Sequence, residues 1–249
     1  MNDQIHFISQ YLATSGKSFL EHRPDDSHTN VGFNSTTKSL ETWDLDKNGL
    51  KLIFDLTQFK LKWNSEDLLE LELNGKSHRQ VVEWLEKSAI QVGLKKPYTF
   101  DLHYDLPFEW NDQLSFELNE QNSLKELIRL RILANGVLDS FLSSANLKSD
   151  IRIWPHHFDT GAFAILEDSS GKSIGMGMAI PDALINDHYF YLSGYHGHDG
   201  INTSGFKTLS MGEWKNEGFK GAVIAASNIT NEEAIKFFEE SYQEYLGAG

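Results

Sequence analysis

Histidine is the residue type in this sequence with the most evident potential for chemistry. Ten histidines are present, and five of them fall between positions 156 and 198. Four of these five lie in two short segments, 154–159 (WPHHFD) and 195–199 (YHGHD). Neutral imidazole and carboxylate groups are ligands that Zn²⁺ and similar divalent ions prefer in proteins. Metal binding is therefore the first chemistry that the sequence suggests.

A metal site in these segments depends on an extended backbone, in which alternate side chains point to the same side. His157 would then share a side with Asp159, and His196 would share a side with His198. A divalent ion held by these groups would activate a water molecule for hydrolysis. The predicted metal ligands are His157, Asp159, His196 and His198.

Simpler interpretations exist for the same residues. Their spacing matches no established metal-binding signature, such as H-E-x-x-H. Asp101 and His103, which are further candidates from the N-terminal half, also fit the wet side of a half-buried strand. A metal-dependent hydrolase with a divalent cofactor is therefore kept as the alternative function, and whether the protein is an enzyme stays open.

Aromatic residues near turns indicate a different kind of site. Trp154 lies beside Pro155, and rings in such positions can line the mouth of a pocket. The preferred expectation is a small-molecule ligand bound in a pocket between two lobes, and a purely structural or interaction protein is a third possibility. The predicted lining residues are Trp154, Phe158, Tyr189 and Tyr191.

Two other chemistries find little support. Gly175 and Gly177 precede an apolar strand instead of opening a helix, so they indicate a close approach of another backbone rather than a phosphate-binding loop. Cysteine is absent, and no serine stands in the strand-turn-helix context of a nucleophile elbow, which leaves nucleophilic catalysis without a recognisable centre.

Composition excludes several classes of partner. The chain has 22 basic and 36 acidic residues and a net charge of −14, which repels phosphate backbones and anionic lipid. We therefore expect no nucleic-acid partner and no membrane partner. The absence of cysteine fits a reducing compartment, and neither a leader pattern nor a bilayer-spanning apolar run is present, so a cytoplasmic location is expected.

The elements that position these residues follow from hydrophobic periodicity. Capping boxes at Ser77, Ser123 and Thr230 mark three helix starts. Helices are expected near 5–12, 77–92, 123–144 and 230–246. Strands are expected at 40–45, 50–56, 59–63, 69–73, 98–106, 151–154, 162–166, 174–180, 189–195 and 221–226.

This order of elements predicts an α+β fold with mainly antiparallel sheets and helices on one side. Two strand-rich halves would lie around the long helix that begins at Ser123. The expected domains are an N-terminal α+β lobe, residues 1–120, and a C-terminal α+β lobe, residues 121–249, which carries the WPHHFD segment. One composite domain is the alternative.

The segment from Trp154 to Asp159 also carries a family resemblance. It is similar to a W-x-x-x-F-D block of an uncharacterised family of bacterial proteins, in which an apolar strand and a Y-x-Y strand follow. The counterparts here are residues 177–182 and 189–191, with a V-x-x-W helix at Val81 to Leu85. The resemblance implies a fold and a bacterial origin, and it implies no activity.

Overall fold

The computed structural model describes residues 2–118, 121–167, 170–227 and 229–247. Two antiparallel sheets and four α-helices lie in these ranges, which confirms the α+β class. The chain groups into two compact units, Met1–Arg131 with Ile153–Phe158, and Ile132–Arg152 with Asp159–Gly249. The expected division at residue 120 stays a prediction. No helix in the described ranges is both long and apolar enough to cross a bilayer.

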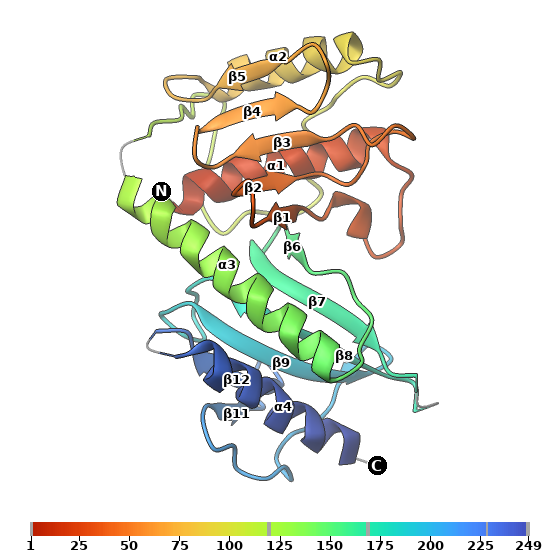
Figure 1. Cartoon of the computed structure of the whole chain (residues 1–249), viewed down its shortest axis with the longest axis vertical. Coiled ribbons are helices and arrows are strands. Elements are labelled where there is room, and N and C mark those ends of the chain that lie inside the picture. Colours follow the sequence, from red (N-terminus) through yellow and green to blue (C-terminus); the bar gives the residue numbers. More distant parts are fainter. Residues whose placement is uncertain (1, 119–120, 168–169, 228, 248–249) are drawn as a thin grey trace. The chain divides into compact units, whose positions relative to one another are not determined.

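The first unit contains a five-stranded antiparallel sheet whose strands follow one another in chain order (Figure 1). A short 3₁₀ turn, η1 (Ser27–Thr29), precedes the sheet. The helix α3 (Gln121–Ser144) begins in this unit and continues into the second. The other elements are α1 (Asn2–Phe19), β1 (Gly32–Asn34), β2 (Ser39–Glu41), β3 (Leu52–Asp55), β4 (Lys60–Trp63), β5 (Glu70–Glu72) and α2 (His78–Gln91).

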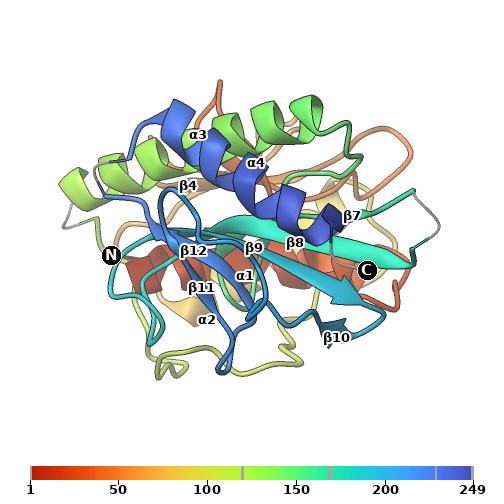
Figure 2. The same cartoon turned by 90° about the horizontal axis from the view of Figure 1, so that it is seen from below.

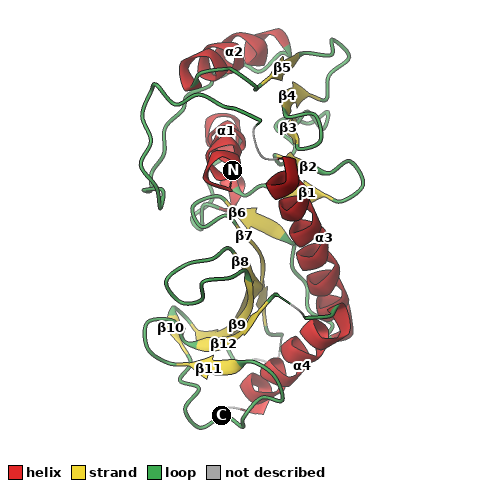
Figure 3. Ribbon diagram, turned by 90° about the vertical axis from the view of Figure 1, so that its left-hand side faces the viewer, coloured by secondary structure: helices red, strands yellow, loops and turns green. Residues whose placement is uncertain are grey.

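The helix α1 is buried on all sides. It lies on one face of the sheet, and irregular chain covers its other side (Figure 3). Every residue from Ile5 to Gly16 is buried, including polar side chains such as His6, Gln10 and Thr14. Buried polar groups require hydrogen-bond partners. These three side chains bond to groups outside α1, whereas Ser9 and Ser15 bond to carbonyl oxygens of the helix itself. The helical stripe expected at 5–12 is thus only part of a longer, enclosed helix.

The strand expected at 98–106 is wrong. Burial alternates residue by residue from Tyr98 to Trp110, as the sequence pattern indicated, but the segment is irregular and pairs with no strand. Its partners are side chains of α1 instead: Thr14 bonds the hydroxyl of Tyr98 at 2.8 Å, and Lys17 bonds Asp101 at 2.7 Å. An alternating pattern therefore indicates an extended chain with one covered side, and a helix supplies the cover here.

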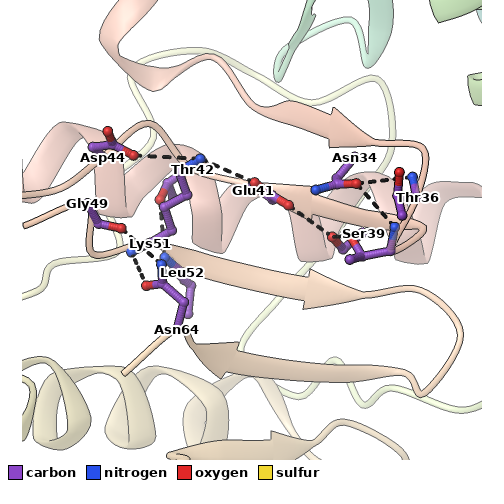
Figure 4. A network of polar contacts seen from close by, with 11 residues as sticks. Asn34, Thr36, Ser39, Glu41, Thr42, Asp44, Gly49, Lys51, Leu52 and Asn64 are labelled. Atoms are coloured by element: carbon purple, nitrogen blue, oxygen red, sulfur yellow. Dashed lines mark hydrogen bonds and ion pairs between the residues drawn. The ribbon is translucent and has the colours of Figure 1, made fainter. Parts of the chain in front are cut away.

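Side-chain bonds join β2, β3 and β4 near the turn that carries Asn48-Gly49 (Figure 4). The Lys51 backbone N–H donates to Asn64 at 2.6 Å, and its ammonium group lies 3.3 Å from Glu41. The Leu52 backbone N–H donates to the Thr42 hydroxyl at 3.1 Å. These contacts continue the backbone ladders of β2, β3 and β4 past the ends of the strands.

In the second unit, α4 and the later turns of α3 lie on the same face of a sheet (Figure 2). Phe238 of α4 stacks on Phe141 of α3 at 5.2 Å and contacts Phe190 of the sheet. The sheet order is β11-β12-β9-β8-β7-β6, and β10 pairs with β9. The strand β6 (Arg152–Trp154) lies at the boundary, because Arg152 belongs to the second unit and the other two residues to the first. The remaining elements are β7 (Asp159–Ile165), β8 (Lys172–Ala179), β9 (Tyr189–His196), β10 (Asp199–Gly200), β11 (Glu213–Lys215), β12 (Gly221–Ala225) and α4 (Asn231–Gly247).

The glycine at position 177 is required by a close approach, as its place in a strand indicated. A Cβ atom there would lie 2.5 Å from the Thr160 carbonyl oxygen and 2.6 Å from the Tyr191 hydroxyl. Tyr191 is the register partner of Gly177 on β9. The ring of Tyr191 can lie across β8 only because no side chain stands there.

Two of the three expected helix caps are confirmed. Ser77 forms a capping box with Gln80, and Thr230 forms one with Glu233. The third is wrong, because α3 begins at Gln121 and Ser123 lies within its first turn. Residues 119 and 120 lie outside the described ranges.

Candidate functional site

Both histidine segments that were expected to be extended are turns. Residues 155–158 form a tight turn in which the Phe158 N–H donates to the Trp154 carbonyl at 2.7 Å. Phe158 has a φ of 57°, in the left-handed region. Between His196 and Asp199, a two-residue turn with Gly197 at φ 62° joins β9 to β10. Pro155 and Gly197 are turn formers. The alternation on which the predicted metal site depended is therefore absent from both segments.

The four predicted metal ligands are also distributed over the two units. His157 belongs to the first unit, and Asp159, His196 and His198 belong to the second. Asp159 is buried and accepts a hydrogen bond from the Tyr191 hydroxyl. Across the described part of the chain, no group of three or more histidine and carboxylate side chains is arranged to hold a metal ion.

The four predicted pocket residues have different surroundings. Phe158 is only 1% exposed, so it is a core residue of the first unit. Tyr189 and Tyr191 belong to the second unit, where their hydroxyls donate to Asp182 at 2.8 Å and to Asp159. Trp154 is half-buried and lines a pocket that is formed by the first unit alone.

This cavity, called the Trp154 pocket below, has a volume of about 240 Å³. Three segments distant in the sequence form its walls. The residues that line it are Asp25, Asp26, Thr29 and Asn30 from the loop around η1, His103 and Tyr104 from the irregular segment, and Trp154, Pro155 and His156 from the turn.

The first wall, the turn at 154–156, is attached to α1. The Pro155 carbonyl accepts from His6 Nε2 at 2.7 Å and from Gln10 Nε2 at 2.8 Å. A carbonyl oxygen can only accept, so His6 carries its proton on Nε2. Both bonds come from buried side chains one helical turn apart, which holds Pro155 between the two pocket residues Trp154 and His156.

The second wall depends on the same helix. The Tyr104 hydroxyl donates to Gln10 Oε1 at 2.6 Å. Gln10 therefore joins two walls, because its amide nitrogen bonds Pro155 and its amide oxygen bonds Tyr104. The Tyr104 ring lies 5.6 Å from the His156 ring, centre to centre, so the two walls meet at His156.

The third wall, the loop around η1, approaches α1 at a glycine. A Cβ atom on Gly16 would collide with the His28 carbonyl oxygen and lie 3.2 Å from Thr29 Cα. The same loop is also bonded to Trp43, whose indole N–H donates to the Ser27 carbonyl at 2.8 Å. Asp26 has a φ of 55°, a conformation that Asp and Asn adopt more readily than most residues.

Histidines surround the carboxylate of Asp26. His103 Nε2 lies 3.2 Å from one oxygen, and His22 Nε2 lies 3.4 Å from the other. Burial, together with the nearby His157 and His103, lowers the pKa of His156 to about 4, although Asp26 opposes this shift. His156 is consequently a neutral ring at pH 7.

Asp25, which precedes Asp26 in the same loop, is ionised at pH 7. Burial opposes its ionisation, but hydrogen bonds from Ser27 and the charge of Arg23 outweigh that effect and hold the pKa of Asp25 below its usual range. The Arg23 guanidinium lies 5.4 Å from the Trp43 ring centre and does not line the pocket.

Three side chains, those of His6, Phe158 and Arg131, stack on one another at the end of the turn. The Phe158 ring is parallel to the His6 ring at 4.8 Å, and the Arg131 guanidinium lies 4.3 Å from the centre of Phe158. Arg131 is 2% exposed and also donates to the Phe158 carbonyl. A cation over an aromatic face is attracted by the ring electrons, and burial strengthens that attraction.

His6 makes stability depend on pH in a predictable direction. Burial lowers the pKa of His6 from 6.5 to about 4, so the unfolded state binds the extra proton between these values. Stability therefore falls as the pH drops from about 6.5 to about 4, by up to about 3 kcal/mol from this residue. Urea unfolding at pH 7.0 and pH 4.5 measures the loss.

The variant His6→Gln should lose less stability than the native protein over that interval. His198→Gln, a change in an exposed turn, is the control and should retain the native dependence on pH. An equal loss in the native protein and in His6→Gln would contradict the assignment.

The sequence did not indicate Asp25, Asp26 and Tyr104 as members of a site. Asp25 and Asp26 lie in a polar loop of turn formers, and Tyr104 lies in the segment that was interpreted as a strand. The only local pattern that includes Tyr104 is the alternation of residues 98–110, which their burial follows. The participation of all three depends on contacts with α1 that no local pattern reveals.

Comparison of the chain with family models, with curated proteins and with solved structures found no match. Membership of the W-x-x-x-F-D family therefore stays a prediction.

Proposed function

We propose that the protein binds a small molecule in the Trp154 pocket. The observation that supports this is that all three walls are attached to α1. Gln10 bonds both Pro155 and Tyr104, and Gly16 leaves room for the backbone of the loop at His28. A pocket held in place before the ligand arrives avoids the entropy cost of ordering its walls. Binding sites are commonly concave, with aromatic walls and a few placed polar groups.

Composition supports the same class of partner. The net charge of −14 disfavours nucleic acid and anionic membrane surfaces as partners. The absence of cysteine supports a reducing compartment, and we place the protein in the cytoplasm on that basis.

A thermal-shift screen of metabolites tests the proposal. At least one compound should raise the melting temperature of the native protein, and Trp154→Leu should abolish the shift. Trp84→Leu is the matched control, because Trp84 is a half-buried tryptophan of α2 outside the pocket. Hits that persist in Trp154→Leu, or a complete lack of hits across metabolite classes, would refute the proposal.

A further inference from the structure

The Trp154 pocket combines negative charge with aromatic walls. Asp25 and Asp26 both line it, and its nine lining residues include no lysine and no arginine. His156, the ring at the meeting point of two walls, is neutral at pH 7. A ligand in this pocket therefore meets two carboxylates, and one of them, that of Asp26, also lies 3.2 Å from Nε2 of the lining residue His103.

Three rings meet around the same space. The His156 ring lies 6.4 Å from the Trp154 ring at an interplanar angle of 87°, and 5.6 Å from the Tyr104 ring at 52°. The three rings therefore line the same pocket at large angles to one another. Aromatic faces attract ammonium groups, with Trp the strongest of the side chains, and the attraction increases as water is removed.

We propose that the ligand is a small organic cation, an ammonium group on a compact apolar body, with Asp26 providing the countercharge and Trp154 the apolar wall. This inference rests on the proposed function of the pocket. A volume of about 240 Å³ corresponds to about eight atoms of the size of a water molecule, which fits a simple amine.

Other ligand classes fit the same walls less well. An anion would approach two carboxylates, with no lysine or arginine in the lining to bind it. A divalent metal ion requires several converging ligands, and the described residues contain no such group of three. A neutral molecule would leave the Asp25 and Asp26 charges without a partner from the ligand.

Three probes of nearly the same shape separate these classes: choline, the neutral 3,3-dimethylbutan-1-ol and the anionic 3,3-dimethylbutanoate. Isothermal titration or saturation-transfer NMR on the native protein should detect choline, with the alcohol and the anion at least about tenfold weaker. Equal binding of choline and the alcohol, or no binding of choline, would overturn the inference.

Asp26→Asn removes the countercharge without disturbing the backbone, because Asn tolerates the left-handed conformation as well as Asp does. The substitution should weaken the affinity for choline by about tenfold and leave the affinity for the alcohol unchanged. Asp67 is an exposed aspartate of the same unit, so Asp67→Asn is the control for net charge and should change neither affinity. Unchanged choline affinity in Asp26→Asn would also overturn the inference.

The two proposals fail in different ways. If the metabolite screen returns Trp154-dependent hits that are neutral or anionic, the pocket binds a small molecule and the cation inference is wrong. If no compound of any charge depends on Trp154, the proposed function itself is wrong. Circular dichroism of each variant at the titration temperature confirms that a lost signal reflects binding rather than unfolding.

Discussion

Replacing Gly16 with alanine should destabilise the protein by about 2 kcal/mol, although the same change in most helices is stabilising. Alanine favours a helix over glycine by about 1 kcal/mol. At this position the new Cβ would meet the His28 carbonyl oxygen and the Thr29 Cα, which are backbone atoms that cannot swing aside. Overpacking of this kind costs about 1–3 kcal/mol, and the upper part of that range applies here because the contact is with backbone. Urea unfolding measures the difference.

Gly136→Ala is the matched control for this prediction. Gly136 is also a helical glycine, in α3, but it is exposed and a Cβ atom there would meet nothing within 4 Å. Its replacement should therefore stabilise the protein by about 1 kcal/mol. Opposite signs for the two variants are expected. If Gly16→Ala stabilised the protein as Gly136→Ala does, the close approach of η1 to α1 would be disproved.

Replacing Phe158 with alanine should have a larger effect, a loss of about 3–5 kcal/mol. Truncation of a buried Phe removes its transfer energy and leaves a cavity. Phe158 is 1% exposed between His6 and Arg131, so both neighbours would lose their stacking partner. The strain of a positive φ would persist, because alanine also avoids that region. Thermal and urea unfolding should show the loss together.

Phe163→Ala is the control for Phe158→Ala, because Phe163 on β7 is 47% exposed. It should cost less than about 1 kcal/mol. If Phe158→Ala is too unstable to purify, Phe158→Leu, with a smaller change in volume, should still lose more than Phe163→Leu. Equal losses at the two positions would contradict the placement of Phe158 in the core.

Periodicity and turn chemistry predicted most of the fold. The capping boxes at Ser77 and Thr230 marked two helix starts correctly, and the strand glycine at 177 indicated a close approach that the structure contains. Local signals succeed where local contacts decide the conformation. The segment 98–106 failed because alternating burial is shared by strands and by extended chain that packs on a helix.

The site was harder to predict for a physical reason. Trp154 was recognisable because a ring beside a proline turn often lines a pocket, and it does line one. Residue type alone indicated the other predicted lining residues, Phe158, Tyr189 and Tyr191. Asp26 and Tyr104 reach the pocket through contacts between distant segments, Asp26 with His103 and Tyr104 with Gln10 of α1, which periodicity does not detect. The positive φ of Phe158 also placed its ring away from the pocket, in the core.

The attachments of Pro155 to α1 have a consequence for how the protein is made. They join residues 149 and 145 positions apart, whereas Tyr104 reaches Gln10 over 94 positions. A ribosome synthesises α1 first and the WPHHFD turn only after more than half of the chain. His6 and Gln10 therefore lack their hydrogen-bond partner, the Pro155 carbonyl, until the ribosome has synthesised the chain that far. The entropy of closing such a loop rises slowly with its length, so the delay affects the timing of folding more than the final stability. We expect the first unit to complete its folding late, and a nascent chain released before residue 158 to lack the Trp154 pocket.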